Sequence, residues 1–178
     1  MVLKMARLAF CAACLAAAMS MVGCGSSSAT GKYNVEVALG PGMVDPESGA
    51  VSSLEVDLVG VNETESARWT SYPLSQYFSG ADQLRNDASK VTLAFTTDES
   101  GTKILARNDE IWEDWRGRNA DQLFVLVNLL GVDQDLPGDQ DPRRLILPLS
   151  KNRWSGNTLE IEIRPSRVVC QTPLKPVD

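Results

Sequence analysis

Apolar residues alternate with polar ones along most of the chain, with a period of two residues. Between residues 33 and 39, for example, Tyr33, Val35, Val37 and Leu39 occupy every second position. Successive side chains of a β-strand point to opposite faces, so this period is typical of strands with one buried and one solvated face. Clusters rich in glycine, proline and aspartate separate the alternating segments. The pattern predicts a chain dominated by short β-strands.

About seven segments are expected to form strands: 33–39, 54–58, 91–95, 102–106, 123–130, 145–149 and 159–163. The run 123–130 is apolar at nearly every position, which indicates a central strand buried on both faces. Seven short strands separated by turns favour an all-β, immunoglobulin-like sandwich of two packed sheets. Two short helices are expected beside the sheets, one over residues 81–86 capped by Ser79 and one that begins at Asn108.

The first 23 residues have the composition of an export signal. Lys4 and Arg7 make a positive start, residues 8–22 are apolar, and the small Gly23 ends the run. A bilayer span needs roughly 20 apolar residues, and this shorter run is followed by glycine and serine. The sequence therefore favours a removed signal peptide over a permanent membrane helix.

The stretch Met21-Val22-Gly23-Cys24 resembles the lipobox of bacterial lipoproteins. This resemblance implies cleavage before Cys24 and attachment of lipid, palmitate included, to that cysteine. The protein is then expected in the bacterial cell envelope, anchored to a membrane, with the outer membrane on its periplasmic or surface side as the expected site. Ordinary secretion and an unprocessed N-terminal anchor are the alternatives. The chain would divide into a signal peptide (1–23), a lipidated flexible tether (24–32), one sandwich domain (33–172) and a C-terminal tail (173–178).

Lipidation also settles the expected state of the cysteines. Cys11 and Cys14 would leave with the signal peptide and Cys24 would carry lipid, so only Cys170 would remain in the folded domain. No intramolecular disulfide can then form. Because two valines precede Cys170, we expect a partly buried, inert thiol at the end of a strand.

Signal-peptide removal would make an acidic chain more acidic. The sequence has 17 Lys and Arg against 23 Asp and Glu, and loss of Lys4 and Arg7 leaves 15 against 23, a net charge of −8. Nucleic-acid binding needs clustered Lys and Arg, so we expect no nucleic-acid partner. Anionic lipid head groups are also expected to repel the domain, which leaves the lipid on Cys24 as its membrane attachment.

The sequence contains no histidine. Ser-His-Asp and Cys-His catalysis and histidine metal sites are therefore excluded. It also lacks a Gly-x-Ser-x-Gly elbow, a phosphate-binding glycine loop and a dinucleotide fingerprint. A hydrolase based on two carboxylates would need a defined pair, and none stands out. We expect a protein that is not an enzyme and needs no cofactor.

The acidic segment 133–141 has spacing typical of metal ligands. Asp133, Asp135, Asp139 and Asp141 offer the hard oxygen ligands that calcium prefers. The segment does not match the twelve-residue EF-hand pattern. It is either a calcium site or a solvated surface loop.

Aromatic residues gather in a long connection after the second expected strand. Tryptophan and tyrosine dominate binding hot spots, so this connection is a candidate surface for a protein partner. The alternative is that these rings, together with Trp112, Trp115 and Trp154, plug the ends of the sandwich. The candidate partner-binding residues are Trp69, Tyr72, Tyr77 and Phe78.

The order of these segments resembles the small outer-membrane lipoprotein of type VI secretion systems: a strand at 54–61, the aromatic connection, a helical turn around Leu84 and a return to strands. The resemblance implies a transthyretin-like β-sandwich tethered to the outer membrane, with a loop that contacts an inner-membrane partner. Some residues have no counterpart in that family's pattern, namely Asp57, Gly60, Asn62 and the Asp-Pro-Arg-Arg stretch at 141–144.

These observations predict a lipid-anchored protein of the cell envelope that binds or scaffolds a protein partner without catalysis. One alternative is a lipoprotein that binds calcium or another ligand through the loop 133–141. The second alternative is a lipoprotein of a membrane complex like that of type VI secretion.

Overall fold

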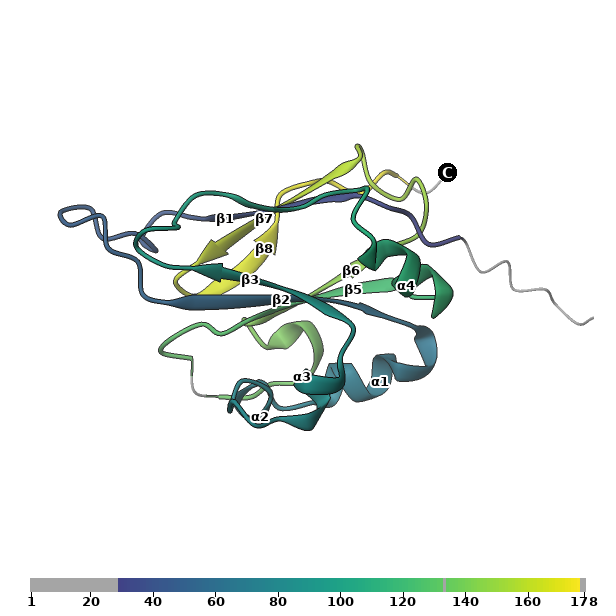
Figure 1. The fold of residues 1–178 in the computed structure, drawn as a ribbon, viewed down its shortest axis with the longest axis horizontal. Helices are drawn as coiled ribbons and strands as arrows, with labels where there is room; N and C mark the ends of the chain where they lie inside the picture. The colour runs from purple at the N-terminus through teal and green to yellow at the C-terminus, as the bar shows by residue number, and fades with distance from the viewer. Residues whose placement is uncertain (1–28, 133, 177–178) are drawn as a thin grey trace, which may run out of the picture.

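The computed structural model describes residues 29–132 and 134–176. The predicted signal peptide, Cys24 and Asp133 lie outside the described residues. Two four-stranded sheets pack face to face, which confirms the predicted two-sheet β-sandwich (Figure 1). None of the helices in the described part of the chain is long and apolar enough to cross a membrane.

The first sheet has the order β4-β1-β7-β8 and the second the order β3-β2-β5-β6. Strands β1 and β7 run parallel, and every other neighbouring pair is antiparallel. The strands are β1 (Asn34–Leu39), β2 (Leu54–Val61), β3 (Lys90–Phe95), β4 (Lys103–Leu105), β5 (Gln122–Val127), β6 (Arg144–Pro148), β7 (Thr158–Arg164) and β8 (Arg167–Cys170).

The eighth strand, β8, is one more than the sequence predicts. It pairs with β7 across a tight turn, with Arg164 opposite Arg167. Only Val168 of its four residues is buried, so its alternation is too short to place it among the seven expected strands, although the two valines predicted a strand end at Cys170. Cys170 ends β8 as a free, partly buried cysteine, and burial raises the pKa of its thiol.

In the described residues, four α-helices and a short 3-10 helix accompany the sheets: α1 (Glu63–Ser71), α2 (Leu74–Tyr77), α3 (Gln83–Asp87), α4 (Ile111–Gly117) and η1 (Gly138–Gln140). The two expected helices correspond to α3 and α4, but their starts differ from the prediction. Asp82, not Ser79, caps α3 by accepting a hydrogen bond from the Arg85 amide. The prediction missed α1 and α2.

Two hydrophobic clusters hold these layers together. The larger lies between the sheets and includes Val35, Val56 and Leu159. The smaller lies between the outer face of the second sheet and helices α1 to α3, and includes Val59 and Phe124 (Figure 1). Strand β5 contributes to both clusters, so the predicted central strand is indeed buried on both faces.

Helix α4 closes one end of the sandwich with two tryptophans. Trp112 and Trp115 are fully buried, and their rings meet edge to face with centroids 4.9 Å apart. Trp115 lies directly on the backbone of Gly60 in β2, where a Cβ atom would fall 2.4 Å from the indole Cγ. Gly60 therefore makes the space into which α4 packs.

Both ends of the described chain are bound to the sandwich. The Thr30 hydroxyl donates to the Ala120 carbonyl over 2.6 Å, and the Gly31 amide donates to the Leu149 carbonyl over 2.6 Å. At the other end, the Lys175 amide donates to the Arg153 carbonyl over 2.9 Å. The bound part of the chain therefore begins before residue 33 and continues past residue 172, the limits expected for the domain.

Replacing Gly60 by alanine is expected to lower the free energy of unfolding by about 1–3 kcal/mol, because the added methyl group would overlap the buried Trp115 ring. Urea unfolding followed by tryptophan fluorescence measures the change. Gly101→Ala is the matched control, since no atom lies within 4 Å of a Cβ there. Equal stability of the two variants would contradict the assigned role of Gly60.

Candidate partner-binding site

The aromatic connection predicted as a binding surface is divided between core and surface. Trp69 in α1 and Tyr77 in α2 are buried, with ring centroids 6.0 Å apart, and Trp69 also packs near Phe124 of β5. Tyr72 and Phe78 are half-buried. The two buried rings fix helices to the second sheet, so the surface available to a partner here is provided by Tyr72, Phe78 and the exposed helix residues between them.

A buried carboxylate holds these helices in place. Asp57 of β2 is fully buried on the helix-covered face of the second sheet. Its oxygens accept hydrogen bonds from Arg85 Nε over 2.8 Å, Tyr77 Oη over 3.0 Å and Thr92 Oγ1 over 2.6 Å. The Arg85 guanidinium also pairs with Glu55 over 2.8 Å. The Asp57 carboxylate thus links helices α2 and α3 to strands β2 and β3.

The electrostatics of this cluster follow from its burial. Hydrogen bonds to the Asp57 carboxylate raise the pKa of Arg85, which therefore stays charged. Burial, aided by the nearby Asp57 charge, raises the pKa of Tyr77, which keeps its proton and donates it to Asp57. Arg85 also lies 4.9 Å from the Phe78 ring centroid, a cation–π contact that orders this ring near the surface.

The acidic segment 133–141 is organised by an arginine. Arg143 contacts Asp141 through Nε at 2.9 Å and Nη2 at 2.8 Å, and its Nη2 contacts Asp135 at 2.7 Å. Asp135 in turn accepts a hydrogen bond from the Ser75 amide over 2.9 Å, which ties the segment to α2. Two of the four carboxylates in the predicted calcium set, Asp135 and Asp141, are thus paired with an arginine of the same chain.

The remaining members of the predicted calcium set do not join this pair. Asp139 is exposed in η1, and Asp133 lies outside the described residues. No group of three or more acidic or cysteine side chains in the described ranges is placed to hold a metal ion. The calcium site stays a sequence prediction that the geometry of Asp135 and Asp141 does not support.

Arg144 also holds this region together, by donating hydrogen bonds to main-chain carbonyls. Its Nη1 donates to the carbonyls of Thr70 over 2.8 Å, Leu136 over 3.1 Å and Gly138 over 3.1 Å, and its Nη2 donates to that of Tyr72. One buried guanidinium thus joins the end of α1 to the 133–141 segment. The stretch at 141–144 therefore stabilises the backbone between β5 and β6 from inside the domain.

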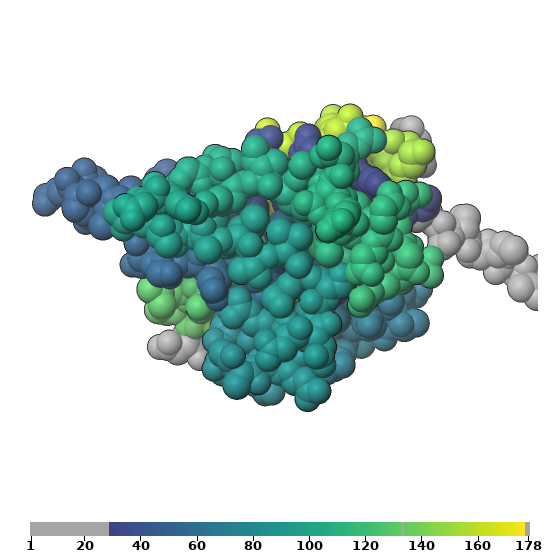
Figure 2. Space-filling model, in the orientation of Figure 1, coloured from purple at the N-terminus to yellow at the C-terminus, as the bar shows by residue number. Residues whose placement is uncertain are grey.

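A loop between β1 and β2 projects from the sandwich. It covers residues 40–53, and it lies at the end of the domain opposite to the start of the described chain (Figure 1 and Figure 2). The loop carries Val44, one of the few large apolar side chains exposed among the described residues, with 36% of its surface accessible. Its reach and exposure make it a second candidate surface, which the sequence prediction missed.

Hydrogen bonds within the loop give it a defined shape. Val44 and Val51 form an isolated antiparallel bridge, and the Asp45 amide donates to the Ala50 carbonyl over 2.9 Å. The Asp45 side chain accepts hydrogen bonds from the Ser48 amide and hydroxyl, each over 2.7 Å. These bonds from Ser48 hold the pKa of Asp45 below its usual value. Val51 is buried at the base, so the loop is a small hairpin fixed to the core.

The architecture defines the class of protein as a two-sheet β-sandwich with helices over one outer face and a projecting loop. No protein-family model and no curated protein sequence matches the chain.

Several solved structures that match in fold come from type VI secretion systems (T6SS). The T6SS lipoprotein TssJ1 from Pseudomonas aeruginosa aligns with a TM-score of 0.52 and 11% identity, covering 83% of this chain and 99% of that one. A structure of the TssM C-terminal domain from EAEC aligns with a TM-score of 0.52 and 12% identity over 78% and 98%. A type VI membrane complex gives 0.50 and 14% over 79% and 98%. The chain thus has the TssJ-like sandwich fold.

The stability of the fold is expected to depend on pH through Asp141. Burial opposes its ionisation, but hydrogen bonds from Arg143 outweigh burial and hold the pKa of Asp141 below its ordinary value. Such a group stabilises the fold above its unfolded-state pKa of about 3.9, and the contribution is lost as pH falls through the lower folded value.

Thermal unfolding between pH 2 and 7 tests this expectation. The Asp141→Asn variant should be less stable than the wild type at pH 7, and the difference should shrink below about pH 4. Asp98→Asn, in an exposed loop, is the matched control and should follow the wild type. A pH-independent difference between Asp141→Asn and wild type would contradict the assignment.

Proposed function

We propose that this protein is a lipid-anchored, non-catalytic component of a cell-envelope complex like the type VI secretion membrane complex. The observation that carries the proposal is the fold itself, which covers 98–99% of the matched type VI chains from end to end. The lipobox resemblance at Cys24 supports the same conclusion independently, because Cys24 lies outside the described sandwich. The bacterial envelope, with the outer membrane as the anchoring membrane, is part of this proposal.

The partner is proposed to bind at the β1–β2 loop, residues 40–53. Ala29 is the first described residue after the lipidation site, and the loop projects from the other end of the domain (Figure 1). A partner that approaches from across the periplasm would meet the loop first. The loop offers exposed Val44 beside the acidic Asp45 and Glu47 on a preformed turn, so binding costs little conformational entropy.

The buried state of Trp69 and Tyr77 favours the loop over the aromatic connection. Binding hot spots must be accessible before the partner arrives, and these two rings are only 6% and 0% exposed. Tyr72 and Phe78 remain as a secondary surface on the helical side of the domain.

The lipid anchor is tested by replacing Cys24 with serine in the full-length chain. Serine has no thiol for the lipid thioether, so the variant should lose labelling by palmitate and leave the membrane fraction after cell lysis. Cys170→Ser is the matched control and should be labelled as strongly as the wild type. Palmitate labelling that persists in Cys24→Ser would contradict Cys24 as the attachment site.

The loop is tested by replacing Val44 with aspartate and measuring co-purification of type VI membrane-complex proteins from crosslinked cells. A charge at an apolar contact should reduce recovery about tenfold or more, a loss of roughly 1.4 kcal/mol or more. Ile104→Asp is the matched control, because Ile104 is 56% exposed on the outer face of the first sheet. Equal recovery with both variants, or no recovery with the wild type, would contradict the proposal.

A further inference from the structure

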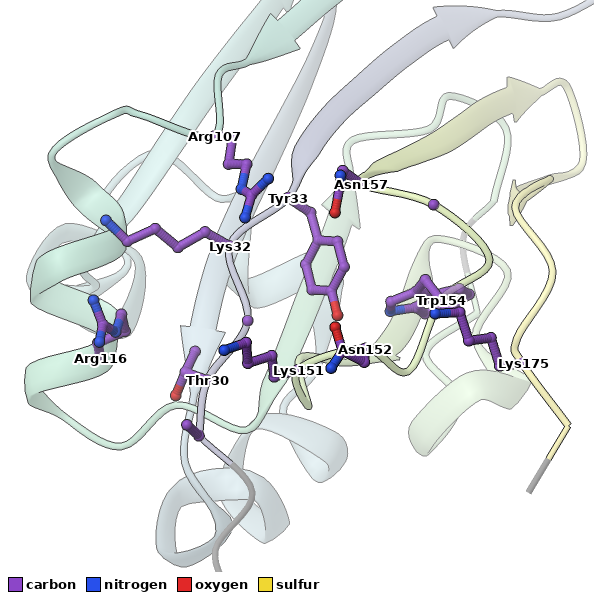
Figure 3. A pocket seen from close by; sticks show the side chains of 13 residues that line it. Thr30, Lys32, Tyr33, Arg107, Arg116, Lys151, Asn152, Trp154, Asn157 and Lys175 are labelled. Atoms are coloured by element: carbon purple, nitrogen blue, oxygen red, sulfur yellow. The ribbon is translucent and has the colours of Figure 1, made fainter. Parts of the chain in front are cut away.

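A pocket at the tether end of the sandwich is lined by cationic side chains from separate parts of the chain. It has a volume of ≈ 420 Å³. Its walls come from the segment before β1, the connection between β4 and α4, helix α4, the connection between β6 and β7, and the C-terminal segment. Figure 3 shows them around Tyr33. The cationic lining residues are Lys32, Arg107, Arg116, Lys151 and Lys175.

The charge of this pocket is opposite to that of the domain. Five of the 15 Lys and Arg residues that follow the predicted signal peptide line it, although the net charge of that part is −8. No acidic side chain is among its described lining residues. Chance placement of surface charges on an acidic protein would not be expected to exclude carboxylates from a site with five cations.

Two of the five cations are partly neutralised from outside the pocket. Glu113 of α4 forms ion pairs with both Lys32 and Arg116. Arg107, Lys151 and Lys175 have no ion pair with any acid in the described residues, and all three are exposed. Three unpaired positive charges therefore face solvent across one cavity.

Hydrogen bonds fix the floor of the pocket. The Lys151 amide donates to the Ala29 carbonyl over 3.1 Å, and the Tyr33 hydroxyl donates to the Ser150 carbonyl over 2.7 Å. Trp154 is buried beside them, with its indole N–H donating to the Pro148 carbonyl over 2.8 Å. Asn152 and Asn157 add amide groups to the lining. A preformed floor with three unpaired cations and neutral amide donors suits a phosphate group.

The position of the pocket indicates where that phosphate comes from. Ala29 lines the pocket, and it follows Cys24 by five residues. Five residues span at most about 18 Å even when fully extended. A lipid on Cys24 would therefore hold the pocket close to the head groups of the membrane.

We infer that this pocket binds the phosphate group of an anionic membrane phospholipid and so orients the anchored domain. The inference rests on the lipid anchor of the proposed function for its geometry. Glu36, Glu160 and Glu162 on the outer face of the first sheet would be repelled by the same head groups. Attraction at the pocket and repulsion at that face would together direct the β1–β2 loop away from the bilayer. The net charge of the domain alone would predict only repulsion between the domain and anionic head groups.

The test uses the full-length chain in neutral detergent micelles, titrated with dihexanoyl phosphatidylglycerol and followed by tryptophan fluorescence, since Trp154 lines the pocket. Dihexanoyl phosphatidylcholine and inorganic phosphate are titrated in parallel. Saturable binding of phosphatidylglycerol is expected, at least tenfold tighter than that of either comparison ligand. The double variant Arg107→Gln/Lys151→Gln should weaken it at least tenfold.

The matched control is Arg68→Gln/Arg167→Gln, which removes two exposed cations outside the pocket and should bind like the wild type. The inference is overturned if this control weakens binding equally, if phosphatidylcholine binds as well as phosphatidylglycerol, or if inorganic phosphate alone binds as tightly. Cys24→Ser should keep the same affinity in micelles. Failure of palmitate labelling would thus count against the anchor, whereas failure of this titration would count against the pocket.

Discussion

The carboxylate of Asp57 has no access to solvent, and the packing of the helices on the second sheet depends on how its charge is neutralised. A buried ion without a partner costs several kcal/mol, so Arg85 must reach it from α3 and Tyr77 from α2. Both helices are too short to be stable alone. This cluster and the apolar contacts around it set the position of α2 and α3 on one face of the second sheet, and the buried Trp69 ring holds α1 on the same face.

Arg143 and Arg144 likewise satisfy buried polar groups, here in irregular backbone. The segment between β5 and β6 is long and mostly without regular structure, so its carbonyls cannot all pair in a ladder. Arg144 binds four of the main-chain carbonyls around it, and Arg143 joins two aspartates. Planar guanidinium groups suit this task because each presents several donors in a fixed geometry.

The strands could be predicted from the sequence because each carries its own alternating pattern. Helix α1 could not be predicted in this way, because Trp69 is its one buried residue and it has no apolar stripe at helical spacing. The burial of Trp69 and Tyr77 and the role of Arg143 depend on contacts between distant segments, so local patterns present them as surface. One signal was available: β2 is apolar at Val59 and Val61 as well as at Val56 and Leu58, which indicates that helices cover its outer face.

The placement of β1 has a mechanical consequence. The strand joins the N-terminal segment of the described domain to the β1–β2 loop, so a pull between the proposed lipid anchor and the proposed partner would pass along Asn34–Leu39. It lies inside its sheet, with β4 on one side and β7 on the other. Hydrogen bonds between strands lie across the strand direction, so such a load would shear many of them together rather than open them one by one. Tension between the proposed anchor and the proposed partner would therefore be carried by a single strand that is hydrogen-bonded on both sides.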